Sequence, residues 1–264
     1  ALPILLYVAN AALNNVALID LSQGKVSDQV RTGNQPEFVA VSPDGRLLLV
    51  SNRNGGTVTL IGLSEELGGS HTGSLIGEIK VGSQPGPLAI RPDGKQAFVA
   101  NFGDGTVSVL DLEARKLLTH LETGRQPVSL VMKPDGGELF VANGGEEWIS
   151  IINTYADEVS QSLTAGRNPS RLAVDPSGAL LFYSNVESAA LSMVNIANRQ
   201  HLPTVALGTV AGAMASNSAS RYLLVLGATS DDLSVVDPSV PSLVTKIPTG
   251  KSPVDIAVIR IPAP

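Results

Sequence analysis

One short motif recurs through almost the whole chain at a nearly constant interval. A large apolar or aromatic residue begins it, and Asn usually ends it. Its copies are Tyr7-Val8-Ala9-Asn10, Leu49-Val50-Ser51-Asn52, Phe98-Val99-Ala100-Asn101, Phe140-Val141-Ala142-Asn143, Phe182-Tyr183-Ser184-Asn185 and the degenerate Leu224-Val225-Leu226-Gly227. Their last residues are separated by 42, 49, 42, 42 and 42 positions. A fixed period of about 20 to 50 residues is typical of propellers and solenoids, so this period limits the fold more than any other feature.

Two further markers repeat in the same register. A turn position follows each tetrapeptide by ten residues, at Asp20, Gly62, Asp111, Asn153, Asn195 and Asp237. A glycine recurs at Gly33, Gly82, Gly124, Gly166, Gly208 and Gly250, and all but Gly208 are followed three residues later by Pro. Three markers with one spacing indicate a true structural repeat.

Each period divides into four short segments of alternating apolar and polar residues, separated by turn residues. In the second period these are approximately 38–41, 46–50, 58–61 and 78–81. Tight turns are predicted between the first two segments, at Pro43-Asp44-Gly45, Pro92-Asp93-Gly94, Pro134-Asp135-Gly136 and Pro176-Ser177-Gly178, because Pro presets φ, Asp bonds back to the backbone and Gly accepts positive φ. Four-stranded units of this size are propeller blades.

The chain ends predict how such a ring closes. Residues 5–9 match the second strand of a blade, and residues 253–259 match a first strand. Together they would complete one blade and remove exposed sheet edges. We therefore predict an all-β, six-bladed propeller with four antiparallel strands per blade, formed by residues 1–264 as a single domain. The first residues lack the basic segment of a signal peptide, so a mature soluble domain is expected.

Composition excludes several partners and chemistries. The net charge of −6 argues against a surface that grips phosphate backbones, so no nucleic-acid partner is expected. No apolar run is long enough to span a bilayer, so no membrane insertion is expected. The absence of cysteine removes disulfides and thiol chemistry, and fits export to an oxidising compartment. We expect a monomer.

The repeated motifs resemble the YVTN family of β-propeller repeats. The tetrapeptide, the Pro-Asp-Gly turn, the Thr-Val pairs at Thr57-Val58 and Thr106-Val107 and the Gly-x-x-Pro link carry this resemblance along essentially the whole chain. It implies an extracytoplasmic protein, periplasmic, secreted or part of a surface layer, alone or as a module of a larger protein. Many members are seven-bladed, so six blades would be a departure. Related propellers include lactonase-like enzymes and the electron-transfer propellers of amine dehydrogenases, so the resemblance does not fix the function.

Alternation along the innermost strands predicts which side chains reach the central channel. Positions are counted from the Pro of each Gly-x-x-Pro link, or from Ala211 in the link that lacks Pro. The third following residue is large and is expected in the core, whereas the fourth is small, as in Ala173, and is expected at the axis. The second residue should point toward the channel mouth and varies widely: Phe38, Pro87, Ser129, Arg171, Ala213 and Asp255. Arg171 and Asp255 are expected either to neutralise one another across the channel or to bind a polar ligand together.

The links between blades and the loops after each tetrapeptide are expected to share one face, which we call the linker face. It would carry Asn34, Gln84, Arg125, Arg167 and Lys251 from the links and Arg53, Phe102, Glu146, Glu147, Trp148 and Glu187 from the loops. Exposed aromatic residues beside arginines are typical of a recognition surface, although Trp148 would equally suit packing over a neighbouring blade. The predicted ligand-binding residues are Phe38, Arg53, Phe102, Arg125, Trp148, Arg167, Arg171 and Asp255.

An insertion of seven residues distinguishes the second period. The Gly- and Ser-rich segment 64–74 contains it and lies between the third and fourth strands, which places it on the opposite face. It is expected to be a flexible loop, with contact to a partner as the alternative.

Catalytic chemistry finds little support. His71, His120 and His201 fall in different blades, and no nucleophile elbow, phosphate loop or metalloprotease motif occurs. No catalytic residue, metal or cofactor is therefore predicted. The alternative is a divalent cation held at the channel mouth by Glu37, Glu146, Glu147, Glu187 or Asp255 with Asn10, Asn101 or Asn185. The Asn recurs in every blade but one, so we expect it to satisfy backbone groups in its own loop.

Two hypotheses follow. The first is a non-catalytic binding or scaffold module that holds a protein, glycan or small molecule on its linker face. The second is a lactonase-like or lyase-like propeller enzyme with a metal at the channel mouth.

Overall fold

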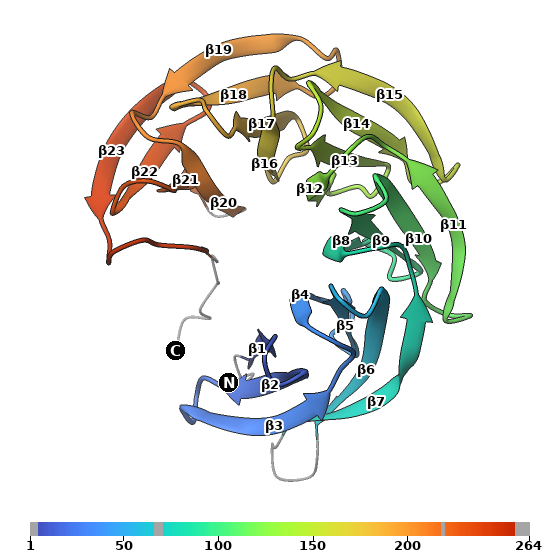
Figure 1. The fold of residues 1–264 in the computed structure, drawn as a ribbon. Coiled ribbons are helices and arrows are strands. Elements are labelled where there is room, and N and C mark those ends of the chain that lie inside the picture. Colours follow the sequence, from blue (N-terminus) through green and yellow to red (C-terminus); the bar gives the residue numbers. More distant parts are fainter. Residues whose placement is uncertain (1–4, 66–70, 218–219, 257–264) are drawn as a thin grey trace. The chain divides into compact units, whose positions relative to one another are not determined.

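A computed structural model shows a chain of antiparallel strands. The structure describes residues 5–65, 71–217 and 220–256, and these residues form strands and turns without a helix. No part of them is a helix that could cross a membrane. The chain forms two compact units, Ala1–Pro127 and Val128–Pro264. Within each sheet the strands lie side by side in chain order (Figure 1).

In its described residues, the first unit contains a three-stranded sheet, β1 to β3, and two four-stranded sheets, β4 to β7 and β8 to β11. The strands are β1 (Leu5–Asn10), β2 (Asn15–Asp20), β3 (Lys25–Arg31), β4 (Pro36–Val41), β5 (Leu47–Asn52), β6 (Thr57–Glu65), β7 (His71–Lys80), β8 (Pro85–Ile90), β9 (Gln96–Asn101), β10 (Thr106–Asp111) and β11 (Lys116–Glu122).

The second unit repeats the same four-stranded arrangement in β12 to β15, β16 to β19 and β20 to β23. Its strands are β12 (Pro127–Met132), β13 (Glu138–Asn143), β14 (Trp148–Asn153), β15 (Glu158–Thr164), β16 (Pro169–Val174), β17 (Leu180–Asn185), β18 (Ala190–Asn195), β19 (His201–Ala206), β20 (Ala211–Asn217), β21 (Ser220–Gly227), β22 (Asp232–Asp237) and β23 (Ser242–Pro248).

The predicted strand order is confirmed in these sheets. In the second period, β4, β5, β6 and β7 include or overlap the four predicted segments, although β6 and β7 are longer than expected. The tetrapeptides end the strands β1, β5, β9, β13, β17 and β21. The repeat thus marks the same place in every sheet.

The predicted tight turns between the first two strands are also confirmed. Gly45 has φ of 72°, and its amide donates to the carbonyl of Ser42 at 2.8 Å. Gly94, Gly136 and Gly178 have similar positive φ values of 72°, 77° and 73°. A residue with a Cβ adopts this backbone conformation only at a cost, so glycine is favoured at the turn.

The described residues of segment 64–74 form strands rather than a loop. β6 and β7 continue their ladder through it, pairing Leu63 with Gly73 and Ser64 with Thr72, while residues 66–70 lie outside the described part of the chain. The amide of Gly73 donates to Asp28 Oδ2 at 2.8 Å, which fixes the extended hairpin against β3. The prediction of a loop was wrong for the described residues, because strand pairing satisfies the backbone groups of the extension.

The predicted closing strand receives no direct support. Residues 251–256 form no strand, and residues 257–264 lie outside the described part of the chain. Among the described residues, β1 pairs with β2 alone. Closure by residues 253–259 stays a prediction.

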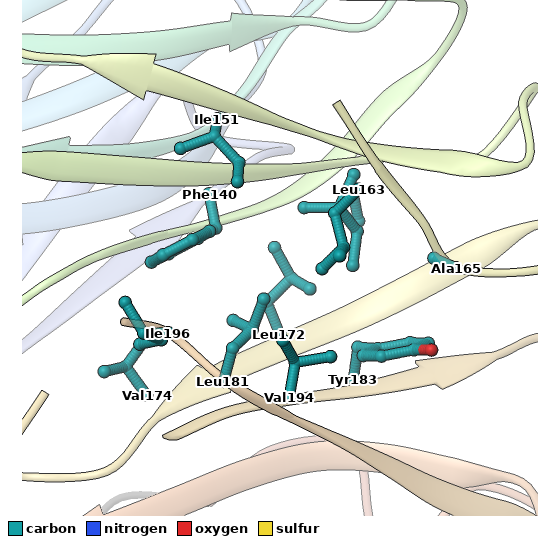
Figure 2. Close-up of a cluster of buried hydrophobic side chains, with 12 residues drawn as sticks. Phe140, Ile151, Leu163, Ala165, Leu172, Val174, Leu181, Tyr183, Val194 and Ile196 are labelled. Atoms are coloured by element: carbon teal, nitrogen blue, oxygen red, sulfur yellow. The ribbon is translucent and has the colours of Figure 1, made fainter. Parts of the chain in front are cut away.

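The core lies between neighbouring sheets. In the second unit, Phe140 and Ile151 face Leu172, Leu181 and Tyr183 (Figure 2). Fully burying one such side chain contributes about 1.5–3 kcal/mol, so each sheet is held mainly by its neighbour.

The expectation that the small fourth residue lies at the axis was wrong at Ala173. Ala173 is buried with Phe182 and Met193 in a second cluster, whereas its neighbour Leu172 belongs to the cluster of Figure 2. The two faces of the sheet look toward two neighbouring sheets, so successive residues alternate between two cores. A small fourth residue therefore fits close sheet packing here.

Candidate functional site

The links between sheets position the loops that follow the tetrapeptides. Gln35 and Gln84 stand directly before a Pro and adopt positive φ, 57° and 51°. Their carbonyls accept the amides of Arg53 at 2.8 Å and Phe102 at 3.1 Å. This conformation is uncommon for a residue other than glycine. Because it recurs at the links, it serves to fix each loop against the start of its own sheet.

Arg53 joins two neighbouring sheets of the first unit. Its Nη1 lies 3.2 Å from Glu37 Oε2, and its Nη2 donates to Gln84 Oε1 at 3.1 Å. The guanidinium carbon lies 5.2 Å from the centroid of the Phe102 ring. Glu37 lies on β4 and Arg53 follows β5 of one sheet, whereas Gln84 precedes β8 and Phe102 follows β9 of the next sheet. We call Glu37, Arg53, Gln84 and Phe102 the Arg53 cluster.

The Arg53 cluster is ordered but remains accessible. The side chain of Arg53 is 29% exposed and that of Glu37 is 39% exposed. An ion pair this exposed contributes at most about 1 kcal/mol, and the cation–π contact about 0.5–1 kcal/mol. A guanidinium carries five N–H donors in one plane, and the contacts described above use two of them. The cluster therefore offers a preformed donor group beside an aromatic ring.

Phe38 and Arg125 extend this surface of the first unit. Phe38, on β4, is 37% exposed. A Cβ on Gly86 of β8 would lie 3.8 Å from its ring, so the ring faces the neighbouring innermost strand. Arg125 is exposed in the link after β11. Phe38 and Arg125 thus add an exposed apolar ring and a cationic group to the surface of the first unit.

The second unit presents a looser version of this pattern. Arg167 Nε lies 3.6 Å from Glu147 Oε1, but the two side chains are 83% and 66% exposed. Solvent therefore weakens this ion pair. Trp148 begins β14 and is half-buried, and its carbonyl accepts the side-chain amide of Asn143 at 3.4 Å. This half-burial is intermediate between the two predictions for Trp148, an exposed recognition residue and a residue packed over a neighbouring blade.

Arg171 and Asp255 are both exposed. Asp255 accepts the amide of Ile256 at 2.8 Å, and no ion pair joins it to Arg171 among the described residues. Exposed charges have little need of a partner. The expected neutralisation across a channel is therefore not seen.

The repeated Asn residues have a structural role in their own sheets. Asn52 donates to Thr57 Oγ1 at 3.0 Å and Thr59 Oγ1 at 2.8 Å, and Asn185 donates to the carbonyls of Ala165 and Arg167. Only backbone partners were expected for these Asn residues, and the Thr hydroxyls bound by Asn52 were not predicted. The signal was present, because a Ser or Thr stands between apolar residues in most third strands.

The structure also bears on the alternative metal site. Among the residues that the structure describes, no three His, Asp or Glu side chains come close enough together to hold a metal ion.

Comparisons with known proteins identify the type of fold. Residues 12–126 match the model of a family described as lactonase, 7-bladed β-propeller, which is less than half of the chain. A chain of Kuenenia stuttgartiensis hydrazine synthase superposes with a TM-score of 0.78 at 22% identity, over 95% of this chain and 85% of that chain. The dihydro-heme d1 dehydrogenase NirN in complex with DHE gives a TM-score of 0.62 at 15% identity, over 95% of this chain and 64% of that chain. No curated protein matches the sequence.

The fold is that of a β-propeller. The family model and the four-stranded antiparallel sheets agree on this assignment. Likeness at such low identity indicates the fold alone, because one propeller scaffold hosts many unrelated functions.

Proposed function

We propose that this protein is a non-catalytic binding or scaffold propeller that holds its ligand on the linker face. The observation that supports this most is the Arg53 cluster, in which Glu37, Gln84 and Phe102 fix one guanidinium across two sheets. Fixing the side chain in advance lowers the entropy cost of binding. Aromatic and arginine side chains are the types that dominate binding energy at interfaces.

The ligand classes we propose are a protein, a glycan or a small molecule that offers a carboxylate or hydroxyl group to Arg53 and an apolar face to Phe102 and Phe38. A carboxylate can accept two parallel hydrogen bonds from one guanidinium. The acidic balance of the chain, with a net charge of −6, makes nucleic acid an unsuitable partner.

Glycan and peptide arrays probed with the purified protein test this proposal. Phe102→Ala and Arg53→Ala should each remove binding to the same array members. Lys116→Ala changes charge equally at the start of β11, away from the linker side, and should leave binding intact. A wild-type protein that binds no array member, or losses that are equal in Lys116→Ala, would contradict the proposal.

A lactonase-like enzyme is the second candidate, and the family match over residues 12–126 favours it. This candidate is tested by assaying hydrolysis of γ-butyrolactone and gluconolactone. The acid that hydrolysis releases is measured with and without Mg²⁺, Ca²⁺, Mn²⁺ or Zn²⁺. Metal-dependent turnover by the wild type that is lost in Asp255→Ala would overturn the binding-only proposal. A thermal-shift screen with the same ions reports metal binding independently of turnover.

We further propose six blades formed by one domain, with residues 253–259 completing the first blade, in a monomeric extracytoplasmic protein of the YVTN type. Support comes from the residue repeat, since six periods occupy nearly all of the 264 residues. A crosslink between cysteines introduced at Ala9 and Asp255 would test the closure. These positions correspond to the paired residues Ser51 and Phe38 of the next sheet, and paired strands bring opposite Cβ atoms within disulfide reach.

A further inference from the structure

The first unit contains a cavity of about 590 Å³ at the junction of the three-stranded sheet and the sheet β4 to β7. Leu5, Tyr7, Leu18 and Leu63 form its apolar wall. Burial raises the pKa of the Tyr7 hydroxyl, as expected beside aliphatic side chains. The volume falls within the range of about 300–1,000 Å³ that is usual for small-molecule sites.

The extended β6–β7 hairpin forms one side of this cavity. Ser64, His71 and Thr72 line it, and all three lie in the extension that distinguishes this sheet. The hydroxyls of Ser64 and Thr72 lie 3.1 Å apart, and the amide bond from Gly73 to Asp28 holds the hairpin against β3. The inserted residues thus build a wall that a sheet with shorter strands would lack.

Opposite charges border the cavity. The hydroxyl of Ser42, the amide of Arg46 and the charge of the Arg46 guanidinium together hold the pKa of the Asp44 carboxyl below its usual value. Asp44 Oδ1 accepts the hydroxyl of Ser42 at 2.5 Å and the amide of Arg46 at 3.1 Å. Among the described residues, no hydrogen bond or ion pair engages the guanidinium of Arg46, although both side chains line the cavity. Asp44 and Arg46 are both exposed, so each can meet one charge of a ligand.

His71 adds an unsatisfied polar group at the same place. Its Nδ1 is buried and has no hydrogen-bond partner among the described residues. A buried polar atom without a partner costs about 1–3 kcal/mol. A ligand that reorders this wall would relieve that cost.

We infer that this cavity binds a free α-amino acid with an apolar side chain. Arg46 takes the carboxylate, with His71 beside it, Asp44 takes the ammonium group, and Leu5, Leu18 and Leu63 receive the side chain. A simple carboxylic acid would place its charge beside Asp44 without compensation, whereas a zwitterion matches both charges.

This site is separate from the Arg53 cluster. Arg46 precedes β5 and Arg53 follows it, so the length of the strand, roughly 20 Å, separates them. The inference therefore does not depend on the proposed function.

Isothermal titration with L-leucine and L-phenylalanine tests the inference, with two ligands that each lack one charge. L-leucinamide lacks the carboxylate, and 4-methylpentanoate lacks the ammonium group. Both should bind the wild type roughly tenfold or more weaker than L-leucine, which corresponds to about 1.4 kcal/mol. If neither amino acid binds, or if 4-methylpentanoate binds as tightly as L-leucine, the inference fails.

Variants assign each charge. Arg46→Gln should weaken the binding of L-leucine to the level of L-leucinamide and leave the binding of L-leucinamide unchanged. Asp44→Asn should weaken the binding of L-leucine to the level of 4-methylpentanoate and leave the binding of 4-methylpentanoate unchanged. Asn keeps the turn, because Asn suits turn positions as Asp does.

Lys95→Gln is the matched control. Asp44 also borders a second cavity of about 530 Å³, which Lys95 lines and Arg46 does not. Loss of binding in Lys95→Gln rather than Arg46→Gln would place the ligand in that second cavity and overturn the assignment. Arg53→Ala should leave leucine binding unchanged, so failure of the linker-face proposal and failure of this one are distinguishable.

Discussion

The side-chain amide of Asn101 donates a hydrogen bond to Ser108 Oγ at 2.8 Å, and both residues are fully buried. The hydroxyl of Ser108 in turn lies 3.0 Å from Nδ1 of His120 on β11. Asn101 also donates to Thr106 and accepts the amide of Gly82 at 3.2 Å. The last residue of the tetrapeptide therefore ties the second strand to the third strand and to the preceding link.

Replacing Asn101 should cost much of the stability of the first unit. Asn101→Ala would leave the Gly82 amide without its acceptor and would remove the hydrogen bonds to the buried Ser108 hydroxyl and the half-buried Thr106 hydroxyl, at a cost of about 2–3 kcal/mol. Asn10 is a matched control, because it is only half-buried and, within the described part of the chain, its side chain donates to Asn15 alone. Asn10→Ala should cost less than about 1 kcal/mol. Urea unfolding followed by circular dichroism measures both, and equal losses would contradict this role.

The residue pattern predicted what depends on neighbours in the chain. Strand order, the tight turn at Gly45 and the place of the tetrapeptide follow from local conformational preference and alternation. The same alternation did not reveal that Leu172 and Ala173 face two different cores. That result depends on a sheet having neighbours on both faces, which no single period of the sequence shows.

The candidate site was predicted in its residue types but not in its contacts. Arg53 and Phe102 were expected on one face, whereas the distance between them depends on how two sheets pack. The cavity beside Arg46 was not predicted at all. It exists because the insertion continues as paired strands, and a Gly- and Ser-rich composition gives little sign of such pairing.

Arg53 and Arg167 should differ in their contributions to stability. Arg53→Ala removes the ion pair with Glu37, the hydrogen bond to Gln84 and the cation–π contact with Phe102. The free energy of unfolding should fall by about 1 kcal/mol. Arg167→Ala removes a pair that solvent already weakens and should stay within about 0.5 kcal/mol of the wild type. Thermal unfolding by calorimetry measures both. A larger loss of stability in Arg167→Ala than in Arg53→Ala would contradict the prediction that the more exposed ion pair contributes less.

Gly73 should tolerate no side chain, unlike its neighbour Gly77 in β7. A Cβ at Gly73 would lie 2.6 Å from Val30 Cγ2 and 3.1 Å from Ile61 Cγ2, whereas a Cβ at Gly77 would meet no atom within 4 Å. Gly73→Ala should therefore cost about 1–3 kcal/mol through overpacking, while Gly77→Ala should be neutral or slightly stabilising. Urea midpoints of the two variants decide the matter. Equal midpoints would mean that the hairpin does not pack against β3 as described.

Stability should fall with acid partly through Asp93. The hydrogen bond from Arg91 holds the pKa of this carboxyl below its usual value, with the amide of Lys95 contributing. Because the folded-state pKa is lowered, the stabilisation is fully present above the unfolded-state pKa of about 3.9 and is lost as the pH falls through the folded-state pKa. Asp93→Asn and Arg91→Gln should each flatten the decline of the urea midpoint between about pH 5 and pH 2, and combining them should add little further change, because they remove the same interaction. A double variant whose effect is the sum of the two single effects would show that Arg91 and Asp93 act independently.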